Sequence, residues 1–368
     1  MTPQVTPHMT PHLVVMAAGT GGHIFPGLAV AREMQGRGWT VSWLGTSHGM
    51  ENKLVPPTGI SLYTISFSGL RGKGLLHAAT GGLRLLKAFW DCLAILRQRG
   101  ATAVLGMGGY VCFPGGLMAS LLNKPLVLVN ADASLLLSNK SLLPVADRVA
   151  FGFAGDAAKR VKNAVITGNP VRAEIEALAE PGQRFAGRSG PLRLLVVGGS
   201  LGAQALNNVL PQALALLPVA QRPQVLHQTG TAQADDVRAA YAKAAVSASV
   251  LPFIDDMPQQ LAACDVMVCR AGAITVSELC AAGVAAILVP LVISTTSHQQ
   301  DNAVWMGRHG AAMHIPQAEL SAQLLADTLS GLSRDSLLLV AQKARALAQP
   351  RAAARVADQI EQLVARQR

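Results

Sequence analysis

One pattern recurs in this chain: a short apolar run, a turn rich in glycine, and then apolar residues at helical spacing. It occurs at residues 13–34, 103–119, 192–210 and 265–283. Apolar strands that alternate with helices indicate parallel sheets covered on both faces. Because each half of the chain holds the pattern twice, we predict an α/β fold of two facing, Rossmann-like, doubly wound parallel-sheet domains. Open sheets of this kind bind ligands beyond the carboxyl ends of their strands, so an inter-domain cleft is the expected ligand site.

The domain boundary is predicted from local composition. Residues 168–193 are rich in Gly, Pro and Arg, which is typical of a segment that connects two domains. We therefore predict a loose tail over residues 1–11, a first domain over residues 12–171 and a second domain over residues 172–349. A C-terminal helix over about residues 350–368 is predicted to pack back on the first domain.

Composition narrows the range of partners. The 31 Lys and Arg exceed the 21 Asp and Glu, which gives a formal charge of +10 and favours anionic partners. Nucleic acid is not expected, because only 4% of the residues are aromatic and no binding motif occurs. The five cysteines show no metal-ligand spacing, so we expect reduced thiols in a cytosolic protein.

Neither a secretory signal nor a membrane span is expected. Residues 1–31 contain no Lys or Arg, so no basic segment precedes the first apolar run. The longest apolar candidate for a span, residues 281–293, is too short and is interrupted by Gly283 and Pro290.

The glycine turns suit an anion, because a turn that opens a helix points unpaired N–H groups outward at the positive end of the helix dipole. The turn at residues 19–22 lacks the third glycine of the dinucleotide fingerprint. Taken alone, such glycines are explained equally well by a tight strand-to-helix connection. His23 follows this turn directly and is a candidate proton acceptor. A lone histidine at a helix start is more often structural, so its role depends on the surrounding motifs.

Eight motifs in order along the chain resemble those of the MurG family of bacterial N-acetylglucosaminyltransferases, glycosyltransferase family 28. They are GTGGHIFPGLAVA (19–31), GLRGKG (69–74), GMGGYV (106–111), GNPVR (168–172), VVGGSLGA (196–203), FIDDM (253–257), RAGAITVSE (270–278) and HQQDNA (298–303). The resemblance implies the GT-B fold. It also implies inverting transfer of N-acetylglucosamine (GlcNAc) from UDP-GlcNAc to the C4 hydroxyl of N-acetylmuramic acid in undecaprenyl-pyrophosphoryl-MurNAc-pentapeptide. This hexosyl transfer converts lipid I to lipid II in peptidoglycan synthesis.

The resemblance implies roles for individual residues. His23 is the expected catalytic base, which takes the proton of the attacking hydroxyl. Glu278 is expected to accept bonds from the ribose hydroxyls, and Ile254 to offer its backbone to the uracil. The expected donor-binding residues are Thr20, Gly21, Gly22, Arg172, Ser200, Ile254, Ala273, Ile274, Thr275, Val276, Ser277, Glu278 and Gln299, with Gln300 as a weaker candidate. No cofactor or metal is expected, because the chain has no DxD motif to hold a divalent ion.

Two segments depart from the family pattern. Residues 129–132 read VNAD where the family usually shows His-Glu-Gln-Asn, so Asp132 is a weak site candidate that offers a carboxylate in place of an amide. Residues 294–297 read STTS where acidic residues often occur. The substrate contacts of both loops stay open.

Residues 69–99 combine six Lys and Arg with a single Asp. A basic, apolar segment can lie on an anionic bilayer. The membrane and acceptor candidates are Leu70, Arg71, Lys73, Leu75 and Leu76. A second apolar series recurs at helical spacing, and for it we expect an ordinary stripe packed in the core; its members are Leu83, Leu86, Trp90 and Leu93.

The implied partners are UDP-GlcNAc, undecaprenyl-linked lipid I and the anionic cytoplasmic face of the bacterial inner membrane, where the protein would be peripheral. Other cell-wall or division proteins are further candidates. Three other functions stay open: a UDP-sugar transferase acting on another lipid such as diacylglycerol, a UDP-GlcNAc 2-epimerase, and an inactive nucleotide-binding scaffold of a cell-wall complex. A nicotinamide-dependent dehydrogenase is least favoured, because neither glycine turn completes the dinucleotide fingerprint.

Overall fold

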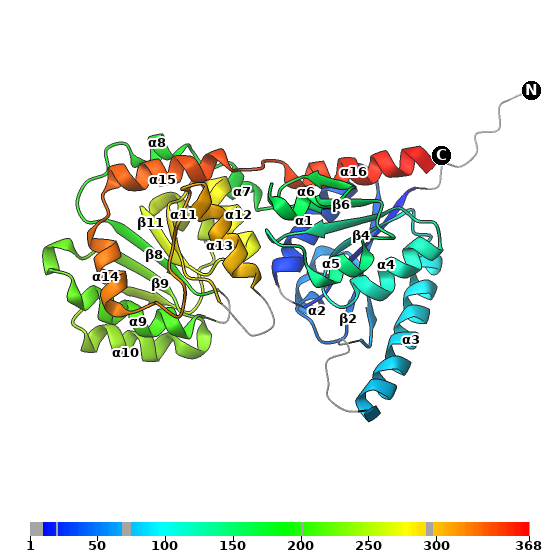
Figure 1. The fold of residues 1–368 in the computed structure, drawn as a ribbon, viewed down its shortest axis with the longest axis horizontal. Coiled ribbons are helices and arrows are strands. Elements are labelled where there is room, and N and C mark those ends of the chain that lie inside the picture. The colour runs from blue at the N-terminus through cyan, green and yellow to red at the C-terminus, as the bar shows by residue number, and fades with distance from the viewer. Residues whose placement is uncertain (1–9, 20, 68–74, 200–201, 292–296, 368) are drawn as a thin grey trace, which may run out of the picture. The chain divides into compact units, whose positions relative to one another are not determined.

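The computed structural model describes residues 10–19, 21–67, 75–199, 202–291 and 297–367, and in helix α3 it describes side chains from residue 81 onward. The chain forms two compact units, each built on one parallel sheet (Figure 1). The first comprises Met1–Ala131, Leu135–Pro170 and Arg351–Arg368, and the second comprises Asp132–Ser134 and Val171–Pro350. Three residues from the middle of the first unit's sequence therefore belong to the second unit.

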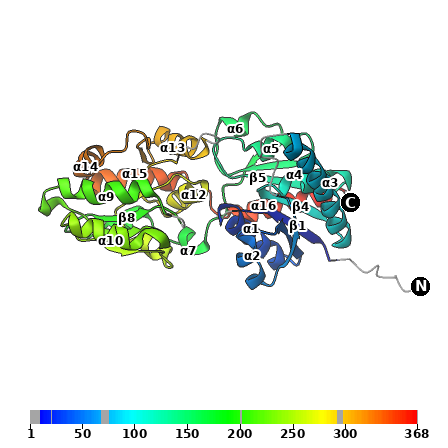
Figure 2. The same cartoon turned by 90° about the horizontal axis from the view of Figure 1, so that it is seen from below.

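The sheet of the first unit is wound in two directions from β1. Its strands pair in the order β3 (Ser61–Ile65), β2 (Thr40–Thr46), β1 (His12–Ala17), β4 (Ala103–Gly108), β5 (Leu126–Asn130), β6 (Arg148–Phe151) and β7 (Ala164–Ile166). Residues 13–17 of β1 are completely buried, because helices cover both faces. One face packs against α1 (Gly21–Gly36), α2 (Glu51–Leu54) and α16 (Ala352–Gln367). The other face packs against α3 (Leu75–Gln98), α4 (Cys112–Leu121), α5 (Leu137–Leu142) and α6 (Asp156–Lys159), and Figure 2 separates α1 and α2 from α4 and α5.

Helix α3 corrects one expectation. Leu83, Leu86 and Trp90, which we expected in the core, leave 69%, 66% and 72% of their surfaces exposed, and Leu93 is half-buried. A neighbouring face of the same helix, which carries the fully buried Cys92, packs against the sheet instead. The helix therefore has two apolar faces, and one of them lies on the surface of its unit.

The second unit repeats this winding around β8. Its strands pair in the order β10 (Ser249–Leu251), β9 (Gln224–Gln228), β8 (Arg193–Val197), β11 (Val266–Cys269), β12 (Ala286–Leu288) and β13 (Met313–His314). Figure 1 shows α9 (Gln204–Leu216), α10 (Ala234–Lys243) and α14 (Ala322–Ser330) along one side of this sheet. The remaining helices are α7 (Ala173–Glu176), α8 (Pro181–Phe185), α11 (Met257–Ala263), α12 (Ala273–Ala282), α13 (His298–Arg308) and α15 (Arg334–Ala346), which packs on α8 and α12.

These strand orders locate the ligand-binding edge of each sheet. The winding reverses between β1 and β4 in the first unit and between β8 and β11 in the second. In doubly wound folds, ligands bind beyond the carboxyl ends of the strands at such a switch point. The two glycine turns that the sequence singles out follow β1 and β8, so each lies at the switch point of its own sheet.

Two general properties complete the fold. Within the described ranges, no helix combines the length and the apolar character that a membrane span requires. All five cysteines are free and buried, and burial raises the pKa of every thiol.

Candidate active site

His23 lies at the switch point of the first unit, in the first turn of α1. Its ring packs against the backbone of Gly108 at the end of β4. A Cβ on Gly108 would stand 2.7 Å from Cδ2 and Nε2 of His23, so a glycine is needed there, and its φ of +125° also suits glycine. Nδ1 of His23 lies 3.3 Å from the carbonyl oxygen of Ala18. A carbonyl can only accept, so Nδ1 carries the proton and neutral His23 keeps Nε2 unprotonated, as a base requires.

A buried carboxylate that the sequence analysis missed holds the first glycine turn. Glu51, the first residue of α2, is fully buried. Its carboxylate accepts the backbone N–H of Gly19 at 3.0 Å and the backbone N–H of Thr46 at 2.8 Å. The N–H of Met50 in turn donates to the carbonyl of Gly19 at 3.1 Å. The only signal in the sequence is an acidic residue after a strand, and such a residue is usually solvated.

The other expected sites of the first unit are described only in part. Gly21 and Gly22 open α1, and a Cβ on Gly21 would press against the ring of Phe25 at 3.0 Å. Four of the expected residues lie outside the described ranges: Thr20, Leu70, Arg71 and Lys73. Leu75 and Leu76 begin α3, but their side chains are also outside the description.

The second glycine turn, residues 198–203, is tied to a neighbouring segment by a glutamine that the sequence analysis also missed. Gln228 ends β9 and is 2% exposed. Its amide nitrogen donates to the carbonyl of Gly199 at 3.1 Å, and its amide oxygen accepts the N–H of Ile254 at 3.1 Å. The backbone N–H of Ile254 is therefore engaged within the unit. Ser200 lies outside the described residues.

Two expected donor-binding residues pair with each other. Nε and Nη2 of Arg172 lie 2.9 and 2.8 Å from Oε1 of Glu278, which stands in the second turn of α12. Burial raises the pKa of the Glu278 carboxyl, and the positive charge and hydrogen bond of Arg172 oppose that rise. The guanidinium thus supports the charged form of Glu278, the form that accepts hydrogen bonds from hydroxyls.

The start of α12 contains five consecutive expected residues. Ala273, Ile274 and Thr275 are its first three residues, and helix geometry leaves their N–H groups without partners inside the helix. Val276 is buried, and the hydroxyl of Ser277 donates to the carbonyl of Ala273 at 2.9 Å. This ten-residue helix therefore directs N–H donors and the positive end of its dipole toward the carboxyl edge of the sheet.

Asp132 is engaged by a third residue that the sequence analysis did not assign. Asn302 in α13 is completely buried. Its amide nitrogen donates to Oδ1 of Asp132 at 2.8 Å and to the carbonyl of Ala271 at 3.0 Å. Its amide oxygen accepts the N–H of Ala133 at 2.8 Å. Asn302 therefore joins residues 132 and 133, which belong to the second unit, to the loop that precedes α12.

Gln299 and Gln300 lie in the first turn of α13. The side-chain oxygen of Gln299 accepts the N–H of Leu291 at 2.9 Å. In the unusual STTS segment, residues 294–296 lie outside the described ranges. Ser297 directly precedes α13, and its hydroxyl donates to Oδ2 of Asp301 at 3.3 Å.

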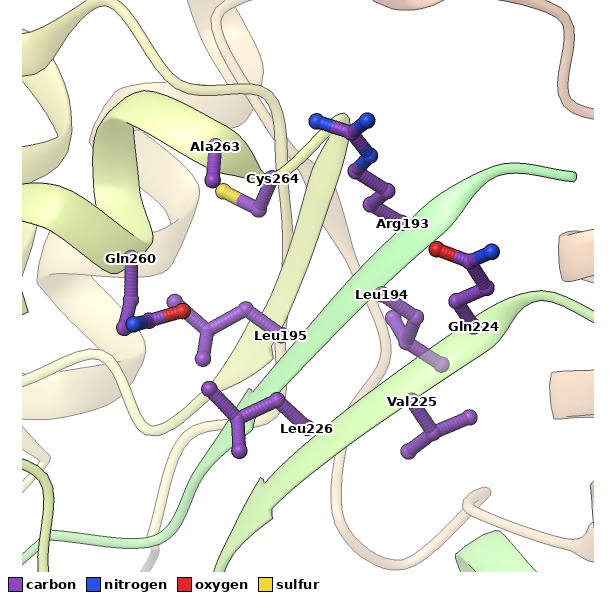
Figure 3. A pocket seen from close by; sticks show the side chains of 9 residues that line it. All are labelled: Arg193, Leu194, Leu195, Gln224, Val225, Leu226, Gln260, Ala263 and Cys264. Atoms are coloured by element: carbon purple, nitrogen blue, oxygen red, sulfur yellow. The ribbon is translucent and has the colours of Figure 1, made fainter. Parts of the chain in front are cut away.

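One pocket of the second unit lies away from these residues (Figure 3). It is lined at the amino ends of β8 and β9, beginning with Arg193 and Gln224, and by Gln260 and Cys264. Since the glycine turn follows the opposite end of β8, this pocket is separate from the expected donor-binding residues. In the part of the chain that the structure describes, no three His, Cys, Asp or Glu side chains gather as a metal would require.

Comparisons with known proteins identify the family of both units. The family model of the glycosyltransferase family 28 N-terminal domain matches residues 13–151, and that of the C-terminal domain matches residues 193–363. A protein of Methylibium petroleiphilum is 70% identical, over 96% of this chain and 97% of its own, and one of Chromobacterium violaceum is 64% identical, over 95% and 98%. Both are named UDP-N-acetylglucosamine–N-acetylmuramyl-(pentapeptide) pyrophosphoryl-undecaprenol N-acetylglucosamine transferase. The crystal structure of Acinetobacter baumannii MurG, 38% identical, gives a TM-score of 0.84 over 96% of this chain and 99% of that one.

Proposed function

The chain belongs to glycosyltransferase family 28, and from this premise we propose how its residues transfer GlcNAc from UDP-GlcNAc to an undecaprenyl-pyrophosphoryl N-acetylmuramyl-pentapeptide. This activity converts lipid I to lipid II in peptidoglycan synthesis. The observation that carries it is the high identity, along nearly the whole of both chains, to transferases of that name.

His23 acts as the base. The C4 oxygen of the acceptor attacks the anomeric carbon of GlcNAc from the face opposite UDP, and its proton passes to Nε2 of His23. The bond between the anomeric carbon and the β-phosphate oxygen breaks, and its electron pair leaves with UDP. The hydrogen bond from Nδ1 to the Ala18 carbonyl supports this role, because it leaves Nε2 as the proton acceptor of the neutral ring.

Glu278 and Arg172 hold the nucleotide. The carboxylate of Glu278 accepts hydrogen bonds from the ribose hydroxyls, while Arg172 turns toward the diphosphate and balances the charge that develops on the leaving group. Their ion pair supports this assignment, because the guanidinium opposes the rise in the pKa of the Glu278 carboxyl that burial causes. When the donor binds, the ribose hydroxyls bind Glu278 and the diphosphate binds Arg172, so each competes with the ion pair between these two side chains.

The backbone and the remaining polar residues complete the donor site. The diphosphate is bound by the first N–H groups of α12, at residues 273–275. It is also bound by the turn at residues 198–203, which includes Ser200. The backbone carbonyl of Ile254 contacts the uracil, because its N–H is engaged by Gln228. Gln299, or Gln300 in its place, bonds sugar hydroxyls. Thr20, Gly21 and Gly22 are the donor contacts proposed from the first unit.

No metal is required in this mechanism. Arg172 and the N–H groups at the starts of α9 and α12 supply the positive potential that a divalent ion supplies in other transferases. Transfer that continues unchanged in EDTA is the expected result.

The exposed apolar face of α3 rests on the cytoplasmic face of the inner membrane. Leu83, Leu86 and Trp90 follow one another at helical spacing, so they lie on one face. Arg84 and Lys87 beside them are exposed cations. Apolar side chains flanked by cations suit the boundary of an anionic bilayer, which supports a peripheral position beside the lipid acceptor.

The test is a transfer assay with purified protein, labelled UDP-GlcNAc and a short-chain lipid I analogue, in EDTA and with an acceptor-free control. We expect a disaccharide lipid that forms only with acceptor. His23→Ala should lower kcat at least about 100-fold while UDP affinity is retained.

Each alternative has its own outcome in this assay. Consumption of the donor without acceptor would indicate an epimerase, and inactivity with intact UDP binding would indicate a scaffold. Transfer to diacylglycerol that the lipid I analogue does not compete with would indicate another lipid acceptor. An unchanged rate for His23→Ala would remove His23 from the mechanism.

A further inference from the structure

We infer that Glu51 is a positioning residue that sets the tautomer and orientation of His23 through the Ala18–Gly19 peptide group. The inference rests on the proposed role of His23 as the base. It adds to the active site a buried carboxylate that does not contact substrate and acts through one backbone amide.

The two ends of this peptide group are held by the two side chains in question. The N–H of Gly19 donates to Oε2 of Glu51 at 3.0 Å. The carbonyl of Ala18, which belongs to the same peptide group, accepts from Nδ1 of His23 at 3.3 Å. In a trans peptide, N–H and C=O point in opposite directions, so carboxylate, amide and imidazole form one continuous chain of hydrogen bonds.

The charge of the carboxylate strengthens this chain. A hydrogen bond from an amide N–H to a carboxylate polarises the amide and makes its carbonyl a better acceptor. A better acceptor favours the ring tautomer with the proton on Nδ1, which leaves Nε2 free to take a proton. A carboxylate that orients histidine directly is a familiar arrangement, and here a peptide group is inserted between the two.

The surroundings of Glu51 fix it in this position. Oε1 accepts the N–H of Thr46 at 2.8 Å and its hydroxyl at 2.7 Å. Gly45 and Gly49 leave space for the side chain: a Cβ on Gly45 would stand 2.7 Å from Cγ of Glu51, and one on Gly49 would overlap the carboxylate. Among the described residues, no Lys, Arg or His pairs with Glu51, so three hydrogen bonds compensate its buried charge.

The peptide group is also fixed from the side. A Cβ on Gly109 would lie 2.6 Å from the carbonyl oxygen of Ala18, so the backbone of Gly109 closely covers this carbonyl. The N–H of Ala18, which belongs to the preceding peptide group, donates to the carbonyl of Gly108 at 3.3 Å and so anchors the adjoining backbone. The peptide plane therefore has little freedom to turn, so the hydrogen bond between its N–H and Glu51 also fixes the direction of the carbonyl that His23 binds.

Glu51→Gln tests the inference, because a carboxamide has one acceptor and one donor end. Whichever way it turns, its NH₂ group faces the N–H of either Gly19 or Thr46. We expect kcat to fall about 10- to 100-fold, the size typical of groups that orient a catalytic ligand, with KM for UDP-GlcNAc nearly unchanged. The matched control is Thr46→Val, which removes the hydroxyl bond to Oε1 but leaves the bond from Gly19 to Oε2, and should leave kcat within about twofold.

A double-mutant cycle separates positioning from general stability. If Glu51 acts through His23, Glu51→Gln should lower kcat in the parent chain and have no further effect in the His23→Ala background. An equal loss in both backgrounds would overturn the inference and leave Glu51 a structural residue. A kcat for Glu51→Gln within twofold of the parent would overturn it as well.

The tautomer of His23 gives a readout independent of activity and of the folding of any Glu51 variant. ¹⁵N–¹H correlation spectra of the ring, assigned by loss of the signal in His23→Ala, should show the Nδ1-protonated form in the parent chain. A ring protonated on Nε2 in the parent chain would overturn the inference. If His23→Ala leaves turnover unchanged, the base role fails and the kcat comparisons no longer test the inference; the positioning by Glu51 then holds only if the share of the Nδ1-protonated form falls in Glu51→Gln.

Discussion

Gly108→Ala is the substitution that tests most directly whether the position of the His23 ring matters. The new Cβ would stand 2.7 Å from Cδ2 and Nε2 of the imidazole. Since ordinary carbon contacts are about 3.5–4.0 Å, the ring must move by roughly 1 Å. A misplacement of that size in a catalytic group costs about 100-fold in rate. The backbone adds a cost of its own, because alanine at a φ of +125° is strained by roughly 1–3 kcal/mol.

The assay is steady-state transfer to the lipid I analogue, together with UDP binding by calorimetry and thermal unfolding. We expect kcat to fall about 100-fold and the affinity for UDP to change little, because Gly108 lies in the first unit and the proposed nucleotide contacts are mostly in the second.

The control is Gly38→Ala. Gly38 also has a positive φ, +82°, but a Cβ there would meet nothing within 4 Å. It should show a similar loss of stability and a normal kcat. If Gly108→Ala keeps its kcat, or if Gly38→Ala loses as much, the steric argument about His23 is refuted.

Four further predictions concern other parts of the molecule. Glu278→Ala should weaken UDP-GlcNAc binding about 10-fold or more by loss of hydrogen bonds to a charged group; unaltered donor affinity, measured by calorimetry, would refute the ribose role. Arg172→Met should shift the pH dependence of donor binding upward, because the pKa of Glu278 rises further without the guanidinium. Burial lowers the pKa of His227 to about 4, so this ring binds a proton more readily in the unfolded chain than in the folded one. The free energy of unfolding of the second unit should therefore fall by about 3 kcal/mol as the pH drops from 6.5 to 4. In acid unfolding monitored by circular dichroism, His227→Gln should lack this loss. Replacing Leu83 and Trp90 by Ser should reduce cosedimentation with anionic vesicles several-fold and leave the fold intact, because both side chains are exposed; undiminished cosedimentation would remove this face of α3 from the membrane contact.

Local patterns in the sequence are sufficient to predict the architecture. Apolar strands followed by glycine turns and helices are local patterns, and their repetition predicts the two parallel sheets that the structure contains. Motif order and spacing also indicated the family, which the comparisons confirm. The sequence also places His23 and Glu278 near the starts of helices that follow strands. This position can be read from the number of residues between each side chain and the preceding glycine-containing turn.

Which side chains meet depends on contacts between residues that are far apart in the sequence. Residues 83–96 of α3 carry apolar side chains on two faces at the same spacing, and only packing against the sheet selects the buried one. The pairing of Arg172 with Glu278 joins residues that are 106 positions apart. Glu51 reaches the turn at Gly19 across 32 positions, and no local pattern distinguishes this buried carboxylate from a solvated one. Local periodicity encodes elements and their buried faces, whereas the contacts that position an active site arise from long-range packing, which leaves no period in the sequence.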